Sequence, residues 1–135
     1  MISTKGRYAI RLMIDLAEQP QDTAVPLNDI AKRQGISKKY LESVVKLLVQ
    51  GKLVKGASGK GGGYRLTRAP EAYTIDEILM LTEGTLASVA CLDHGADPCP
   101  NASYCKTLPM WQKYDALTHD FFAGITLSDL VAGNV

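Results

Sequence analysis

Long apolar runs are missing from this chain of 135 residues, in which no uninterrupted apolar stretch exceeds a few residues. A membrane-spanning helix needs about 20 mostly apolar residues, so the pattern excludes such a span. The opening residues, MISTKGRYAI, include Lys5 and Arg7 but no apolar run behind them, and we therefore expect no secretory signal. These absences favour a cytoplasmic protein without a membrane partner.

Histidine is scarce as well, with only 2 residues in the chain. No Ser/His/Asp set suited to nucleophilic catalysis is recognisable, and no motif would orient a cysteine against a histidine. The sequence therefore predicts a binding protein rather than an enzyme.

Negative charge is sparse in the first half of the chain. Residues 1–70 hold 13 Lys and Arg against 5 Asp and Glu, a balance of +8, whereas residues 71–135 hold 2 against 9, a balance of −7. A basic front half is typical of a chain that binds a polyanion. Alternatively, the charges of the two halves simply form ordinary solvent-exposed surfaces, and no polyanion binds.

Two helices joined by a tight turn are predicted within this basic half. The first lies near residues 27–34 and ends at Gly35, and the second is capped by Ser37 and runs to about Gln50. Polar residues at the start of the second helix make this a helix-turn-helix pattern, in which side chains and free backbone amides reach a DNA groove. The candidate DNA-binding residues here are Ser37, Lys38, Lys39, Tyr40, Glu42, Ser43 and Lys46.

A glycine-rich stretch, KLVKGASGKGGGYRLTR, follows the second helix and predicts a β-hairpin. A helix-turn-helix followed by such a hairpin is a winged helix. The tip is not a nucleotide-binding P-loop, because Gly61 follows Lys60 where that motif requires Ser or Thr. Ser58, Lys60 and Gly61 are instead candidates for contact with DNA along a minor groove, with a merely flexible turn as the alternative.

Helical periodicity continues on both sides of these elements. Apolar residues predict a first helix capped by Ser3 or Thr4, and a capping box from Thr74 to Glu77 opens another helix. A further helix after Pro109 is rich in aromatic residues and is a candidate dimer interface, unless it folds back on its own core. The expected dimerisation residues are Trp111, Tyr114, Leu117 and Phe121.

All 3 cysteines, Cys91, Cys99 and Cys105, lie in one loop, with 7 residues between the first two and 5 between the last two. Disulfides are rare in the cytoplasm, so this cluster favours metal binding or redox chemistry. Iron–sulfur clusters and zinc both usually take four ligands, which leaves these thiolates one short. His94 is a tentative fourth ligand, and spacing alone does not distinguish iron, zinc and bare redox thiols.

The fold class we expect is mainly α, a winged helix-turn-helix with a small β-hairpin wing and a long C-terminal dimerisation helix. Residues 1–70 would form the DNA-binding domain and residues 71–88 a connecting helix. Residues 89–108 would form the cysteine-rich loop, and residues 109–135 the dimerisation helix followed by a short C-terminal helix.

The motifs STKGRYAI, PLNDIAKRQGISKKYLE, GKGGGYRL and ITLSDLV, together with three loop cysteines, resemble one family of bacterial winged-helix repressors. That family includes the iron–sulfur regulator IscR, the nitric-oxide sensor NsrR and the iron-responsive RirA, and the resemblance covers nearly the whole chain. It implies a homodimer that binds a roughly palindromic double-stranded DNA operator. It also implies an iron–sulfur cluster, 2Fe–2S or 4Fe–4S, held by the cysteines, with zinc as the less favoured alternative.

The chain departs from the family pattern at three positions. Ser58 stands where IscR-like proteins carry an arginine before the wing tip, and Lys60 follows two residues later. Leu108 stands where IscR has a cluster-binding histidine, and Arg7 stands where NsrR has a cluster-binding acid. The cysteine spacing is closer to that of RirA, and the resemblance thus implies an incomplete or weak fourth position.

Two other functions stay open at this stage. One is a winged-helix regulator without a cluster, controlled by thiol oxidation or by a protein partner. The other is a zinc- or redox-handling protein whose basic half reads no specific operator.

Overall fold

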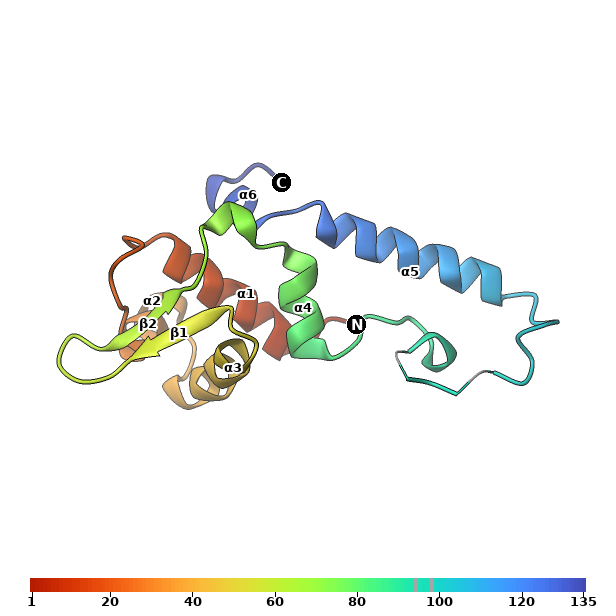
Figure 1. Ribbon diagram of the computed structural model, residues 1–135, viewed down its shortest axis with the longest axis horizontal. Coiled ribbons are helices and arrows are strands. Elements are labelled where there is room, and N and C mark those ends of the chain that lie inside the picture. The colour runs from red at the N-terminus through yellow and green to blue at the C-terminus, as the bar shows by residue number, and fades with distance from the viewer. Residues whose placement is uncertain (94, 98) are drawn as a thin grey trace.

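The structure is a computed structural model that describes residues 1–135 except His94 and Pro98 (Figure 1). Helices dominate it, and its one described sheet has two strands, as expected for a winged helix. The elements in chain order are α1 (Thr4–Ala17), α2 (Leu27–Gln34), α3 (Lys38–Gln50), β1 (Val54–Ala57), β2 (Gly63–Leu66), η1 (Pro70–Ala72), α4 (Ile75–Glu83), η2 (Ala90–Leu92), α5 (Leu108–Ala123) and α6 (Leu127–Ala132).

Local capping chemistry sets the helix-turn-helix boundaries, as predicted. Helix α2 ends at Gly35, whose φ of 66° is left-handed and therefore suits glycine. The Ser37 hydroxyl then accepts a hydrogen bond from the Tyr40 backbone N–H at 3.1 Å and caps α3. Because each signal lies within a few residues of the helix end it fixes, the turn between α2 and α3 is specified locally.

The wing is an antiparallel pair in which Val54 lies opposite Leu66. A bridge between Val25 and Tyr64, with hydrogen bonds of 2.8 and 2.9 Å, joins it to the segment before α2. A Cβ on Gly63 would lie 2.4 Å from the backbone of Val25, so only glycine allows this approach. Strand β1 begins at Val54, and the buried Leu53 lies just before it.

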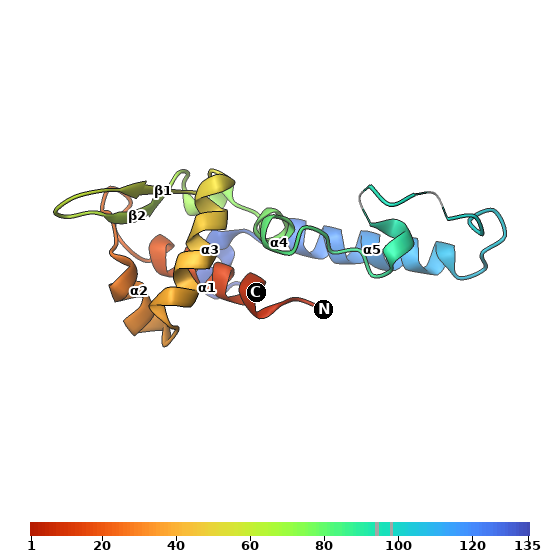
Figure 2. The ribbon, with the colours of Figure 1, turned by 90° about the horizontal axis from the view of Figure 1, so that it is seen from below.

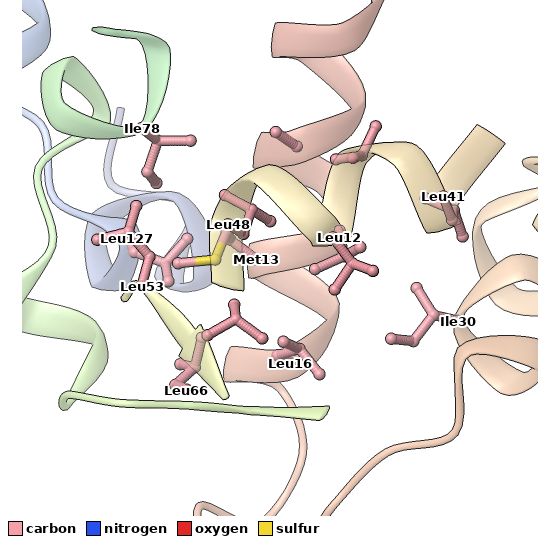
Figure 3. Packing of buried hydrophobic residues seen from close by; sticks show 14 of the residues in the cluster. Leu12, Met13, Leu16, Ile30, Leu41, Leu48, Leu53, Leu66, Ile78 and Leu127 are labelled. Carbon is pink, nitrogen blue, oxygen red and sulfur yellow. The ribbon is translucent and has the colours of Figure 1, made fainter. Parts of the chain in front are cut away.

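The hydrophobic core surrounds α1, which contacts α2, α3, α4 and α6 (Figure 3). Helix α1 buries an apolar stripe in this core, and Leu41 and Leu48 of α3 are buried with it. The stripe consists of Ala9, Leu12, Met13 and Leu16. Leu127 of α6, with no exposed surface, packs into the same core near Ile78 of α4. Helix α6 therefore belongs to the packed body of the winged helix, although it follows the projecting helix in the sequence.

Helix α5 extends away from this body (Figures 1 and 2). The chain runs outward after α4 and returns along α5, and among the residues of α5 none is fully buried. Four large apolar side chains on the helix are more than half exposed, namely Met110, Tyr114, Leu117 and Phe121. None of the described helices is long and apolar enough to cross a membrane.

Tyr73, which has no exposed surface, joins the wing to the helices behind it. Its hydroxyl accepts hydrogen bonds from the backbone N–H groups of Thr67 and Arg68, at 2.9 and 3.0 Å, and donates to the Leu53 carbonyl at 2.7 Å. One side chain thus satisfies three backbone groups at the base of the wing.

Replacing Tyr73 by Phe should lower the free energy of unfolding by about 1–3 kcal/mol, because buried backbone groups lose their partner. Urea unfolding followed by circular dichroism measures the change. Tyr104→Phe is the matched control, since the Tyr104 hydroxyl bonds to Asn101 on the exposed surface; that variant should stay within about 0.5 kcal/mol of wild type. Equal losses in both variants would contradict the role assigned to Tyr73.

Candidate nucleic-acid interface and cysteine loop

The N-terminal part of α3 presents most of the predicted DNA-binding side chains to solvent. Ser37, the cap, is exposed, and Tyr40 is half-buried against the core. The side chain of Ser43 hydrogen-bonds back to the Tyr40 carbonyl at 2.7 Å. The exposed members of the predicted set are Ser37, Lys38, Lys39, Glu42, Ser43 and Lys46. Lysines and hydroxyls on one helix face, at a capped N-terminus, suit phosphate and base-edge contacts.

The wing tip is exposed at all three predicted positions, Ser58, Lys60 and Gly61. Gly59 and Gly61 have φ values of 84° and 80°, a backbone that other residues rarely adopt. A Cβ on Gly62 would lie 2.5 Å from the Ala57 carbonyl oxygen, so the turn closes tightly on itself. The tip is therefore a narrow backbone hairpin with one cation, Lys60, at its end.

The cysteine loop is open to solvent. Cys91 lies exposed in η2, Cys99 and Cys105 are half-buried, and all three are free thiols. Among the described residues, no three His, Cys, Asp or Glu side chains lie close enough together to hold a metal ion. His94, the tentative fourth ligand, lies outside the described residues. Cysteine thiolates are the usual ligands of iron–sulfur clusters. To bind such a cluster, the loop would have to bring its three sulfur atoms together.

Cys105 lies beside the start of α5. Its Sγ is 3.4 Å from the Thr107 hydroxyl, and this hydrogen bond, helped by the backbone N–H groups of Thr107 and Leu108, lowers the pKa of the Cys105 thiol. A lowered pKa favours the thiolate, the form that binds metals and reacts with oxidants. The environment of Cys105 therefore suits ligation and redox chemistry alike.

Two polar contacts join α5 to the segments that flank the loop. His119 Nδ1 lies 3.0 Å from the Asp76 carboxylate of α4, and the Ser88 backbone N–H donates to Asp115 at 3.0 Å. Asp76 is 8% exposed, and its Oδ1 has no hydrogen-bond partner among the described residues. These two contacts, which we call the polar joint, therefore help to orient α5 relative to the winged helix next to the cysteine loop.

An apolar groove of about 770 Å³ runs along α5. Its walls include Met1 and Ile2, the segment of residues 85–88, and the α5 side chains Trp111, Tyr114, Leu117 and Phe121. The four predicted dimerisation residues thus line one continuous surface, and three of them are more than half exposed. Aromatic surface of this extent is typical of a protein–protein interface.

Comparison with known proteins identifies the family. The model of Rrf2, described as an iron-dependent transcriptional regulator, matches residues 2–133. The chain belongs to the Rrf2 family. IscR of Aliivibrio salmonicida, an HTH-type transcriptional regulator, is 35% identical over 133 residues, which cover 98% of this chain and 78% of the relative.

Solved Rrf2-type structures agree with the fold. CymR, the global cysteine regulator of B. subtilis, matches with a TM-score of 0.79 and 32% identity, covering 98% of this chain and 96% of CymR. T. potens IscR matches with a TM-score of 0.79 and 31% identity, covering 100% of this chain and 88% of that protein. The predicted fold class and family are therefore confirmed, and this Rrf2 protein is a transcriptional regulator rather than an enzyme.

Sequence reasoning missed the contacts of this Rrf2 protein that depend on packing. His119 belongs to no recognisable sequence motif, yet it pairs with Asp76 of α4. No local signal marks that pair, because the two residues belong to different helices. The Cys105–Thr107 contact had a usable signal, a hydroxyl two residues after a cysteine and just before a predicted helix.

Proposed function

We propose that this Rrf2 protein is a dimeric repressor that reads a specific, roughly palindromic DNA operator. The observation that carries the proposal is the capped N-terminal part of α3, where Lys38, Lys39 and Glu42 are exposed together. It lies in the half of the chain whose charge balance is +8. Cations give affinity for any duplex, whereas a carboxylate discriminates between base edges.

A second copy of the chain is the occupant we propose for the α5 groove. Phe121 and Leu117 are 60% and 69% exposed. Exposing this much apolar surface to water is unfavourable, and burial against a second copy would remove that cost. Paired α5 helices would place two α3 helices on one face of the DNA, where half-sites lie about 34–36 Å apart.

We further propose that an iron–sulfur cluster, 2Fe–2S or 4Fe–4S, sets operator affinity. Cys91, Cys99 and Cys105 would hold it, and Leu108 and Arg7 leave no obvious fourth ligand at the family positions. When bound, such a cluster supplies a partly open iron that can respond to oxygen, nitric oxide or iron supply. His94 or a loop aspartate would fill that position weakly, which suits a sensor better than a structural site.

The polar joint of α5 would couple the cysteine loop to DNA binding. The loop begins beside Ser88, which bonds to Asp115, and ends at the start of α5. Ordering or releasing the loop would change the orientation of α5 and hence the spacing of the two α3 helices. A coupling of about 1–3 kcal/mol would change operator affinity roughly 5- to 150-fold.

A cluster-free regulator controlled by thiol oxidation is the second candidate. The lowered pKa of the Cys105 thiol favours it, and so does the similarity to CymR, a cysteine regulator. Visible absorption with acid-labile sulfide separates the two candidates, because only a cluster produces both.

Replacing Glu42 by Ala should change which DNA sequences bind, because the lost carboxylate no longer accepts from cytosine or repels other base edges. Selection of bound duplexes from a random pool measures the preference. Glu71→Ala, the same change at an exposed acid of η1, is the control and should leave the preference unchanged. An unaltered preference in Glu42→Ala would overturn the assignment of α3 as the reading helix.

Lys60→Ala should weaken binding to every duplex and reduce the dependence of log K on log salt by about one unit, the loss of one phosphate contact. Binding titrations at several salt concentrations measure this slope. Lys60→Arg keeps the charge and should keep the slope. If Lys60→Ala behaves like wild type, the wing tip does not contact the DNA backbone.

A further inference from the structure

Three residues of α1, spaced at i, i+3 and i+7, form a stripe on one face of that helix: Tyr8, Arg11 and Asp15. We call these residues the α1 stripe. They contact the end of α2 and the start of α3, the two segments that flank the turn of the helix-turn-helix.

Asp15 anchors the end of α2. It is 2% exposed, and its carboxylate accepts two hydrogen bonds from Arg33, at 3.0 and 2.7 Å, and a third from the Gln34 side chain at 3.0 Å. A buried carboxylate with this many partners holds the last turn of α2 firmly on α1.

Arg11 holds the turn itself. Its Nε donates to the Gln34 side-chain oxygen at 3.2 Å, and its Nη2 donates to the Gln34 backbone carbonyl, immediately before Gly35. The guanidinium also lies 5.4 Å from the centre of the Tyr8 ring. Only the planar fork of arginine can make both hydrogen bonds while stacking on a ring.

Tyr8 extends the contact to the DNA-facing helix. Its ring meets the Tyr40 ring edge to face, with centroids 5.4 Å apart and planes at 81°. The backbone of Tyr40 is the one that Ser37 caps, so this ring contact and the cap act on the same first turn of α3. The α1 stripe therefore holds α2, the turn and α3 from one side.

We propose that Tyr8 and Arg11 are positioning residues for operator recognition, acting through Tyr40 and the α2–α3 turn. The proposal rests on the function proposed above. Base-edge contacts require the reading helix to be held within about 0.5 Å of its productive position, whereas phosphate contacts tolerate larger shifts. Loosening the α1 stripe should therefore weaken operator binding much more than binding to random DNA.

Tyr8→Leu and Arg11→Lys test this, because the first removes the ring and the second keeps the charge but loses the fork. The measured quantity is the ratio of random-duplex Kd to operator Kd, with an operator selected by the wild-type protein at fixed salt. We expect the ratio to fall about 2- to 10-fold in each variant, while random-duplex Kd stays within about twofold of wild type. Tyr8→Phe, which keeps the ring, and Arg7→Lys, at an exposed position of α1, should keep the wild-type ratio.

A double-mutant cycle with Tyr40→Ala shows whether Tyr8 acts through Tyr40. If it does, Tyr8→Leu should change the ratio far less in the Tyr40→Ala background than in wild type. Urea unfolding of each variant identifies any that is not folded, and Arg11→Lys and Tyr8→Leu serve as independent tests. An unchanged ratio, an equal loss on both duplexes, or an undiminished Tyr8→Leu effect without Tyr40 would overturn the proposal. A wild-type protein that does not prefer any sequence would instead overturn the proposed function, and this inference with it.

Discussion

Phe121→Glu should convert the protein into monomers and remove tight operator binding. Phe121 is 60% exposed on the projecting helix and lines the α5 groove together with Trp111 and Tyr114. If a second copy covers this groove, a carboxylate among its aromatic side chains costs both the lost packing and the burial of a charge. Sedimentation velocity gives the oligomeric state, and a binding titration gives operator Kd, which should rise at least about 100-fold once two linked half-sites become one.

Gln112→Glu is the matched control for Phe121→Glu. It adds the same negative charge to an exposed position of α5 that does not line the groove. This control should remain dimeric and bind its operator normally. A stable dimer in Phe121→Glu itself would place the interface elsewhere on the chain.

Loss of any one loop cysteine should remove the visible chromophore without unfolding the winged helix. Cys91, Cys99 and Cys105 all lie outside the hydrophobic core, so Ala at any of these positions leaves the packing around α1 untouched. Two remaining thiolates are too few to retain a cluster that already lacks a strong fourth ligand. Absorption spectra of anaerobically isolated variants measure the loss, and circular dichroism with thermal unfolding monitors the fold.

Ser103→Ala, in the same loop, controls for a general disturbance of the chain and should keep the chromophore. If one of the three cysteine variants retains a wild-type spectrum, that cysteine is not a ligand. A shifted spectrum in His94→Ala, beside a lost chromophore in the three cysteine variants, would assign the fourth position to His94.

The helix boundaries could be predicted because their signals are local. Gly35 and Ser37 define the turn of the helix-turn-helix, and Thr74 with Glu77 forms the predicted capping box of α4. Each of these signals operates over three or four residues, so it needs no knowledge of the tertiary structure.

Contacts between distant segments could not be predicted in the same way. Asp15 and Arg33 are separated by 18 residues, and a charged residue in an apolar helix gives no sign of which cation will pair with it. The packing of α6 into the core could not be predicted either. Leu127 is fully buried, but in the sequence it is only one apolar residue in a short helix that follows an exposed one. Such pairings are decided by how helices pack, and the contacts of the α1 stripe with α2 and α3 belong to this class.

The cysteine loop lies between these cases. Its spacing predicted a group of three thiols, and the family membership is established. An iron–sulfur cluster, zinc and free redox thiols differ in how closely the three sulfur atoms must approach one another, which cysteine spacing does not encode. Iron–sulfur clusters and zinc both bind cysteine thiolates, so the presence of three cysteines does not distinguish between them.

The measurement that tests the central claim most directly is iron, acid-labile sulfide and zinc content of the anaerobically isolated protein, combined with operator Kd before and after cluster removal. We expect iron and sulfide in stoichiometric amounts, a visible spectrum, and a change in operator Kd of roughly fivefold or more when the cluster is removed. Stoichiometric zinc without acid-labile sulfide, or an operator Kd that does not respond to cluster removal, would contradict it.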